Sequence, residues 1–163
     1  MSPVPVPGAM VRLVPMESSD FGPFLEALVH GYAEDHVRDG QWSPEESLAR
    51  SRAETGQLLP QGLQTPGHLF FSIVAGAPEE KVGVLWLAIQ PRGGFVYDLE
   101  IFEPFRRRGY AEEAMRRAER ELLDRNVHRI ALHVFGPNQG ARRLYAKLGY
   151  EETNVLMAKR LDG

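Results

Sequence analysis

Apolar and polar positions follow two different periods along the chain, and these predict helices in some segments and strands in others. The three- and four-residue spacing of amphipathic helices occurs in four segments, at residues 18–36, 43–59, 110–126 and 138–148. Short apolar or alternating segments, typical of strands, lie at residues 11–14, 69–74, 82–90, 95–102, 130–135 and 151–159. The predicted order is β, α, α, β, β, β, α, β, α, β, with the three central strands joined by short turns as an antiparallel meander.

The helix predicted at residues 110–126 has the clearest amphipathic pattern in the chain. Ala114, Met115 and Leu122 belong to its apolar stripe. Its other face carries Glu–Arg pairs four residues apart, such as Glu112 with Arg116, which stabilise a solvated helix surface. This helix begins directly after a basic turn that follows the preceding strand.

That basic turn reads FRRRGYA, at residues 105–111, and is suited to holding a phosphate. Gly109 and Ala111 allow close approach of the backbone, and the N–H groups of the first helical turn have no partner within the helix. The helix dipole adds positive potential at the same point. Arg106, Arg107 and Arg108 add side-chain charge, although solvation of a turn explains any single arginine equally well.

A second motif occupies residues 130–150, IALHVFGPNQGARRLYAKLGY. Its strand-like part ends before Pro137, and Asn138 is a favourable N-cap for the helix that follows and ends at Gly149. Asn138 and Tyr145 are seven residues apart, so two helical turns place them near one face of this helix.

Together the two motifs resemble those of the GNAT superfamily of acetyl-CoA-dependent N-acetyltransferases. The first is Arg-x-x-Gly-x-Ala at Arg106, Gly109 and Ala111. The second comprises Asn138, Ala141, Leu144, Tyr145, Lys147, Gly149 and Tyr150. The resemblance covers residues 95–161 closely and implies a single α/β (α+β) domain over residues 10–163. Its sheet would be central, mixed and mostly antiparallel, with about six or seven strands and about four flanking helices.

The resemblance also implies which residues bind coenzyme A. Those expected on the pyrophosphate are Arg106, Arg107, Arg108, Gly109, Tyr110 and Ala111. Backbone N–H groups would do most of the holding, and Arg106 or Arg107 would add a side-chain pair. The pantetheine arm would contact the main chain of Leu99 and Ile101, where the fourth strand diverges from the fifth. Asn138 and Ala141 would complete the coenzyme site.

Tyr145 matches the tyrosine that protonates the departing thiolate in the family. A phenol with an ordinary pKa of about 10 is protonated at neutral pH and can donate this proton. A helical tyrosine is also often a core residue. Asp98 and Glu100 alternate with apolar neighbours on the fourth strand, where either would reach an attacking amine as its base. Solvation of a strand face explains these carboxylates equally well, and water chains serve as the base in parts of the family.

The acceptor pocket implied by the resemblance lies between the first two helices and the third and fourth strands. Tyr32, His36, Trp86 and Tyr97 are the candidates there, although core aromatic residues follow the same pattern. The five histidines show no metal-ligand spacing, so the sequence predicts no metal site. The chain has no cysteine, which excludes an acyl-cysteine intermediate and favours direct attack of an amine on a bound thioester.

Composition and charge set the remaining expectations. The chain of 163 residues is 43% hydrophobic and 25% charged, which suits one folded domain. A net charge of -3 disfavours nucleic acid as a partner, and no apolar segment is long enough to cross a bilayer. Residues 1–9 are expected to form a flexible, proline-stiffened tail without signal-peptide features, and the protein is expected in the cytoplasm.

The favoured function is transfer of the acetyl group of acetyl-CoA to a primary amine of a small molecule or a peptide. A non-catalytic module that binds or senses acyl-CoA is the alternative, because it would keep the basic turn without a productive acceptor site. Tyr145, Asp98 and Glu100 favour the enzyme. The identity of the amine and the preference among acyl groups are open, and the last strand is one that could pair across a homodimer.

Overall fold

The computed structural model describes residues 11–162, which form one five-stranded sheet and four α-helices. The strands are β1 (Arg12–Pro15), β2 (His68–Ala75), β3 (Glu80–Gln90), β4 (Gly93–Ile101) and β5 (Ile130–Leu132). The helices are α1 (Ser18–Arg38), α2 (Pro44–Leu58), α3 (Tyr110–Asp124) and α4 (Gln139–Lys147). Short 3-10 helices at Gly62–Gln64 and Glu103–Phe105 precede β2 and α3.

The strands follow one another across the sheet in chain order, from β1 to β5. The pairs from β1 to β4 are antiparallel, whereas β5 runs parallel to β4. A parallel pair needs a crossover connection, which α3 supplies. The predicted mixed, mostly antiparallel sheet with four helices is therefore confirmed, as is the order of elements through α4.

The predicted number of six or seven strands is not confirmed, because the described residues form five. The missing element is the strand expected at residues 151–159, which has no regular secondary structure. A strand exists only where a neighbouring backbone pairs with it. Here the apolar side chains of Val155, Leu156 and Met157 are exposed instead of covered. Pairing of this segment across a homodimer stays a prediction.

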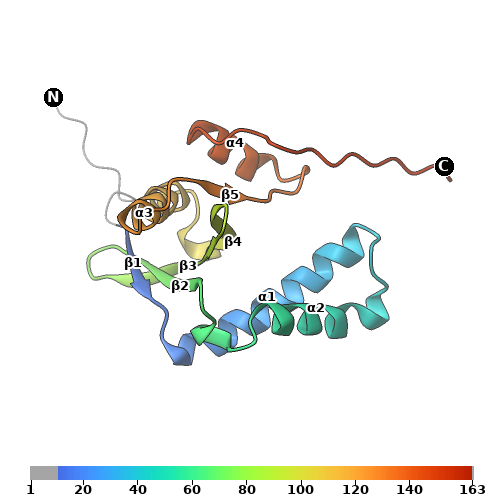
Figure 1. Ribbon diagram of the computed structural model, residues 1–163, viewed down its shortest axis with the longest axis horizontal. Helices are drawn as coiled ribbons and strands as arrows, with labels where there is room; N and C mark the ends of the chain where they lie inside the picture. Colours follow the sequence, from blue (N-terminus) through green and yellow to red (C-terminus); the bar gives the residue numbers. More distant parts are fainter. Residues whose placement is uncertain (1–10, 163) are drawn as a thin grey trace. The chain divides into compact units, whose positions relative to one another are not determined.

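The described chain divides between Leu132 and His133 into two compact units. The first unit holds the sheet with α1, α2 and α3, and the second holds α4 and the C-terminal segment (Figure 1). The N-terminal tail predicted at residues 1–9 lies outside the described residues. Within residues 11–162, no helix combines the length and the apolar character that a membrane span requires.

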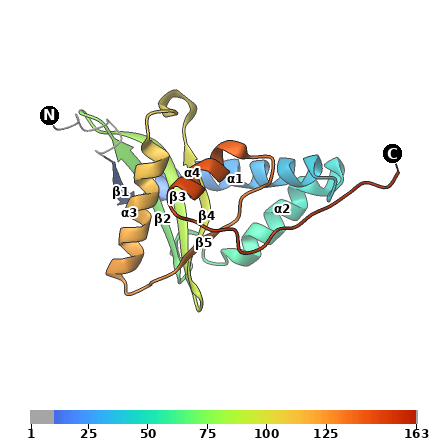
Figure 2. The same ribbon diagram turned by 90° about the horizontal axis from the view of Figure 1, so that it is seen from above.

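In the first unit, α1 and α3 cover opposite faces of the sheet (Figure 2). The α3 face is tightly packed: a Cβ atom added to Gly94 would lie 2.5 Å from Cδ1 of Leu122. On the other face, the ring of Phe24 from α1 contacts the rings of Phe70 and Trp86. Because side chains alternate along a strand, each residue of β3 and β4 belongs to one of these two faces.

Helices α1 and α2 pack against each other through both buried and exposed contacts. The buried hydroxyl of Ser51 donates a hydrogen bond to the carbonyl of Val29 at 2.6 Å. At the surface, the guanidinium of Arg52 binds the carboxylate of Glu26 through two contacts of 2.8 Å. Helix α2 starts with proline in its first turn, as predicted, although the preceding Ser43 makes no side-chain capping hydrogen bond.

In the second unit, α4 begins at the predicted N-cap. Oδ1 of Asn138 accepts a hydrogen bond from the backbone N–H of Ala141 at 3.1 Å. The helix ends just before Gly149, whose φ of 94° suits glycine. An ion pair of 2.7 Å between Arg142 and Glu152 then joins the helix to the start of the C-terminal segment.

Candidate active site

The turn before α3 contains two residues in the left-handed backbone conformation, Arg107 (φ 64°) and Gly109 (φ 81°). Such conformations within a turn form concave nests of N–H groups that attract anions. The left-handed region costs a non-glycine residue about 1–2 kcal/mol, so the geometry at Arg107 is maintained against strain. Strain of this kind is concentrated at functional sites. The side chain of Arg107 is exposed.

The backbone donors of this turn are available to a ligand. The amides of Arg107, Arg108 and Gly109 donate no hydrogen bond to the described residues, and neither do those of Tyr110 and Ala111 at the start of α3. A Cβ atom built on Gly109 would meet no atom within 4 Å, so the space over the turn is open. With the positive end of the helix dipole at the same point, the turn fits a phosphate group.

Two of the three arginines of the turn bind the protein itself. Nε of Arg106 donates a hydrogen bond of 2.7 Å to the carbonyl of Ile101, and its guanidinium lies 3.9 Å from the carboxylate of Glu100. Arg108 donates a hydrogen bond of 3.3 Å to the carbonyl of Pro104. Arg106 thus braces the turn against the end of β4. Its predicted pairing with phosphate stays a prediction that competes with these contacts.

Strand β4 pairs with β5 along only part of its length. The parallel register joins residues 94–96 to residues 130–132. Beyond Val96, no strand of the described chain pairs with this edge of β4. Leu99 and Ile101, where the pantetheine arm is expected, lie in this stretch. An unpaired strand edge is suited to hydrogen bonding with an extended ligand.

A β-bulge interrupts the ladder between β3 and β4 at Tyr97. Trp86 pairs with Asp98, whereas the next residue, Leu87, pairs with Val96. Tyr97 is therefore the extra residue on β4. Residues that oppose each other share a face of the sheet, so Asp98 lies on the face of Trp86, which α1 covers. Bulges commonly redirect side chains beside active sites.

Asp98 has the strongly perturbed carboxyl group of this site. Burial, assisted by the negative charge of Glu100, raises the pKa of Asp98 to about 7. A carboxyl group with such a pKa is well matched to proton transfer near neutral pH. Glu100 lies two residues further along the same face and is exposed. The structure therefore distinguishes the two carboxylates, and Asp98 has the environment typical of a functional residue.

The four aromatic candidates for the acceptor pocket form two separate contacts. Trp86 and Tyr97 stack at the bulge, with ring centroids 4.5 Å apart. Tyr32 and His36 contact each other on α1 at 4.4 Å, and His36 stacks on Trp42 at 4.1 Å. Trp42 was not identified from the sequence. The first pair adjoins the candidate base, whereas the second packs against Trp42 in the loop between α1 and α2.

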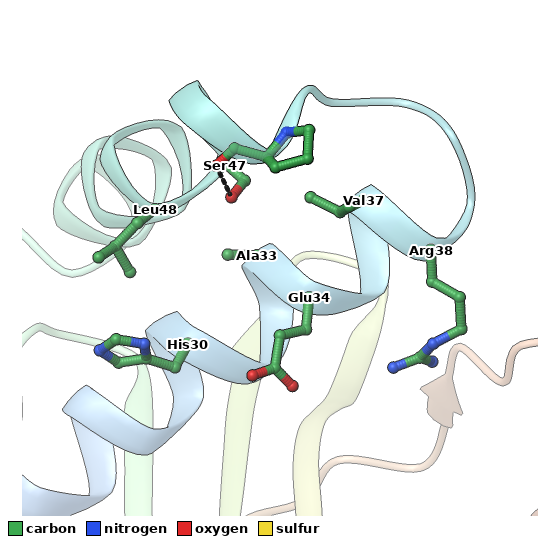
Figure 3. Close-up of a pocket in the computed structure, with 8 residues that line it drawn as sticks. His30, Ala33, Glu34, Val37, Arg38, Ser47 and Leu48 are labelled. Carbon is green, nitrogen blue, oxygen red and sulfur yellow. Dashed lines mark hydrogen bonds between the residues drawn. The ribbon is translucent and has the colours of Figure 1, made fainter.

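A groove of about 500 Å³ lies between α1 and α2 (Figure 3). Ala33 and Val37 from α1 and Leu48 from α2 give it an apolar lining, with His30 and Glu34 beside them. None of the four predicted acceptor residues lines this groove, and it shares no residue with the carboxylates of β4. The groove is therefore not part of the site around the bulge.

The predicted residues Asn138, Ala141 and Tyr145 lie in the second unit. Oδ1 of Asn138 is engaged in capping α4 through the amide of Ala141, so its side chain has a structural role. Tyr145 is half-buried, and its ring centroid lies 5.6 Å from that of Tyr150. Contact of these residues with a coenzyme stays a prediction.

Sequence analysis did not identify His68 and Gln90, which bind the aromatic residues at the bulge. Nδ1 of His68 accepts a hydrogen bond of 2.9 Å from the indole N–H of Trp86. The side-chain amide of Gln90 donates one of 3.0 Å to the hydroxyl of Tyr97. These hydrogen bonds depend on which residues the strand register brings side by side. A single polar residue near the end of a strand does not indicate that register.

The unpaired edge of β4, the amide-lined turn and the carboxyl group of raised pKa suit a group-transfer enzyme with a phosphate-bearing co-substrate. No group of three or more potential metal ligands is gathered within residues 11–162. Residues 26–150 match the acetyltransferase (GNAT) family. The chain belongs to this family and is an acyltransferase of the GNAT type.

Known relatives are similar to this chain over nearly its whole length. YycN of Bacillus subtilis, an uncharacterized N-acetyltransferase, is 36% identical over 155 residues, which cover 93% of this chain and 99% of YycN. YdgE, an uncharacterized N-acetyltransferase of the same organism, is 31% identical over 150 residues, which cover 90% of this chain and 95% of YdgE. The crystal structure of YycN matches with a TM-score of 0.86 over 93% of this chain and 98% of that one. Spermidine N-acetyltransferase from Vibrio cholerae, solved with CoA and spermine, shares the fold at 19% identity, with a TM-score of 0.66 over 95% and 89% of the two chains.

Proposed function

We propose that this enzyme transfers the acetyl group of acetyl-CoA to a primary amine by direct attack in a ternary complex. The observation that carries the proposal is the turn before α3. Its amides, from Arg107 to Ala111, make no hydrogen bond to the described chain, and the space over Gly109 is open. These donors fit the pyrophosphate of the coenzyme, which the GNAT family uses as its acetyl carrier.

Asp98 is proposed as the base that prepares the amine. A primary amine is mostly protonated near pH 7, so its proton must leave before the nitrogen can attack. A carboxyl group with a pKa of about 7 can accept this proton and then release it to solvent within the same pH range. Glu100 adds negative charge on the same face, which attracts the ammonium form of the substrate.

In the transfer step, the amine nitrogen attacks the carbonyl carbon of the thioester. A carbon–nitrogen bond forms, the carbon–sulfur bond breaks, and the bonding electron pair leaves with sulfur. Asp98 takes the proton that the nitrogen loses, and Tyr145 gives its phenolic proton to the thiolate and regains one from solvent. The products are an acetylated amine and the free thiol of coenzyme A, and no enzyme-bound acyl group is required.

The proposed acceptor is an amine that is cationic when free in solution. The carboxylates of Asp98 and Glu100 attract such a cation, and the partly exposed ring of Tyr97 offers cation–π contact beside them. The Vibrio cholerae relative combines this fold with CoA and spermine, which makes polyamines a reasonable part of the first acceptor set.

An acceptor screen tests the proposal. Release of free thiol from acetyl-CoA is measured with polyamines, amino acids, aminoglycosides and peptides, and mass spectrometry identifies the acetylated product. We expect thiol release that equals acetylated amine for at least one acceptor, and none with a Gly109→Val control. Binding of acetyl-CoA without acetylation of any amine would instead favour the non-catalytic acyl-CoA-binding module.

A further inference from the structure

A partly buried hydrogen bond joins β2 to β3 behind the bulge. The side chain of Trp86 is only 2% exposed, and its indole N–H donates to Nδ1 of His68 at 2.9 Å. Burial lowers the pKa of His68, which keeps the ring neutral at pH 7 and leaves Nδ1 able to accept. No buried side-chain nitrogen or oxygen within residues 11–162 lacks a hydrogen-bond partner, so this contact satisfies the indole.

The same indole fixes the side chain of the bulge residue. Trp86 stacks on Tyr97 with centroids 4.5 Å apart and an angle of 22° between the ring planes. Phe95 contacts the Tyr97 ring edge-on at 4.8 Å, and Gln90 donates to its hydroxyl at 3.0 Å. His68 also lies 5.7 Å from the Tyr97 ring. Groups from three strands therefore determine where this ring lies.

The bulge at Tyr97 accompanies the register in which Asp98 pairs with Trp86. The bulge inserts Tyr97 between the pairs Trp86–Asp98 and Leu87–Val96. Slippage by one residue moves a side chain to the opposite face of a sheet. Held as it is, Asp98 lies opposite the buried indole and is partly shielded from water.

We infer that His68 is a positioning residue for the acetyl-transfer reaction: by holding the indole of Trp86, it fixes the bulge at Tyr97 and the shielded setting of Asp98. The inference rests on the proposed function, because it assigns Asp98 to the reaction. A phenylalanine at this position would keep the ring contacts with Phe70, Trp86 and Tyr97 but would leave the indole without its acceptor.

The test compares His68→Phe with His68→Asn. Phenylalanine keeps a ring and removes the acceptor, whereas the side-chain oxygen of asparagine is as many bonds from the backbone as Nδ1 and restores an acceptor. The pKa of Asp98 is measured by NMR titration of carboxyl carbons, with its signal assigned from its loss in Asp98→Asn. We expect the pKa of Asp98 to fall by about one unit or more in His68→Phe as water enters, and to remain near the wild-type value in His68→Asn.

Enzyme kinetics give a second test of the role of His68. In His68→Phe, we expect kcat/KM for the amine to fall between about tenfold and a hundredfold, with the KM for acetyl-CoA unchanged and the acidic limb of the pH profile moved to lower pH. His68→Asn should recover most of this loss. Trp86→Phe removes the donor of the same hydrogen bond and should show the same direction of shift, with effects that do not add to those of His68→Phe.

An unchanged pKa of Asp98 in folded His68→Phe would overturn the inference, and so would a mere loss of thermal stability with a wild-type pH profile. If His68→Phe does not fold, Trp86→Phe and His68→Asn carry the same comparison. The NMR titration needs no turnover, so it remains decisive even if no amine is acetylated. A failure to acetylate any amine would count against the proposed function alone.

Discussion

Trp86 and Asp98 lie directly opposite each other on β3 and β4, at the point where the ladder between these strands shifts by one residue. The indole is almost completely buried, whereas the carboxyl group opposite is half-buried. Burial against such a neighbour disfavours the charged form of Asp98 and raises its pKa to about 7, with a smaller contribution from Glu100. The bulge thus places the carboxyl group of Asp98 where its protonated and ionised forms both exist near neutral pH.

This relationship predicts how stability depends on pH. The pKa of Asp98 is about 7 in the folded state and about 3.9 in an unfolded chain, so the folded state binds more protons between these values. The stability contributed by protonated Asp98 is fully present below the unfolded pKa and is lost as pH rises through about 7. Replacement by asparagine removes this dependence. We therefore expect Asp98→Asn to melt at a higher temperature than the wild type at pH 8, with a smaller difference at pH 5.

Glu100→Gln is the matched control for this measurement. Glu100 is exposed, so its own removal changes little burial, but loss of its charge lowers the pKa of Asp98 modestly. The melting curves should keep the wild-type direction of pH dependence, with its midpoint shifted to lower pH. Parallel melting temperatures of Asp98→Asn and the wild type from pH 5 to pH 8 would contradict the raised pKa.

Gly109→Val should abolish coenzyme binding while the protein remains folded. Valine places branched carbons in the open space over the turn and disfavours the φ of 81° that the turn requires. Gly40→Val is a matched control, since Gly40 also has a positive φ, 74°, with no atom within 4 Å of an added Cβ. Both variants should lose about 1–2 kcal/mol of stability from backbone strain. Only Gly109→Val should lose the thermal shift produced by acetyl-CoA, and equal shifts in the two variants would count against the turn.

Arg107→Gly separates the backbone of the turn from its side-chain charge. Glycine adopts the φ of 64° found here without strain, so the variant should be as stable as the wild type or slightly more so. Its amide is retained, and coenzyme affinity should fall by less than tenfold, with a loss that shrinks at high salt because the missing charge is screened there. Calorimetric titration with acetyl-CoA at two ionic strengths measures the affinity and its salt dependence. A loss as complete as in Gly109→Val would assign the main anchor to the arginine side chain.

The order of elements was predictable because helices and strands have different apolar periods. The helix α3 and the cap at Asn138 follow directly from local residues, as do the antiparallel pairs from β2 to β4. Residues 151–159 include the apolar run at 155–158, yet they form no strand. Apolar side chains favour a strand, but only a paired backbone forms one, and pairing is a non-local property that the pattern does not contain.

For the site, sequence reasoning found the residue types but not their surroundings. Asp98 and Glu100 have equal standing in the sequence, and only the bulge at Tyr97 gives Asp98 its burial and raised pKa. The acceptor hydrogen bond at His68 was missed for the same reason, because it depends on the register between β2 and β3. Arg106 was expected on phosphate, whereas a carbonyl at the end of β4 already binds its guanidinium.

Tyr145→Phe tests the proposed proton donor to the thiolate. The substitution removes one hydroxyl and almost no volume, so the contact with the ring of Tyr150 should survive. Where chemistry limits turnover, kcat should fall about a hundredfold, while affinity for acetyl-CoA changes little. Tyr150→Phe removes the same group from the neighbouring ring and should retain normal turnover. The loss in Tyr145→Phe should also shrink with a thioester whose thiol is more acidic, because a better leaving group needs less protonation. Normal turnover by Tyr145→Phe under rate-limiting chemistry would make it a packing residue and leave protonation of sulfur to water.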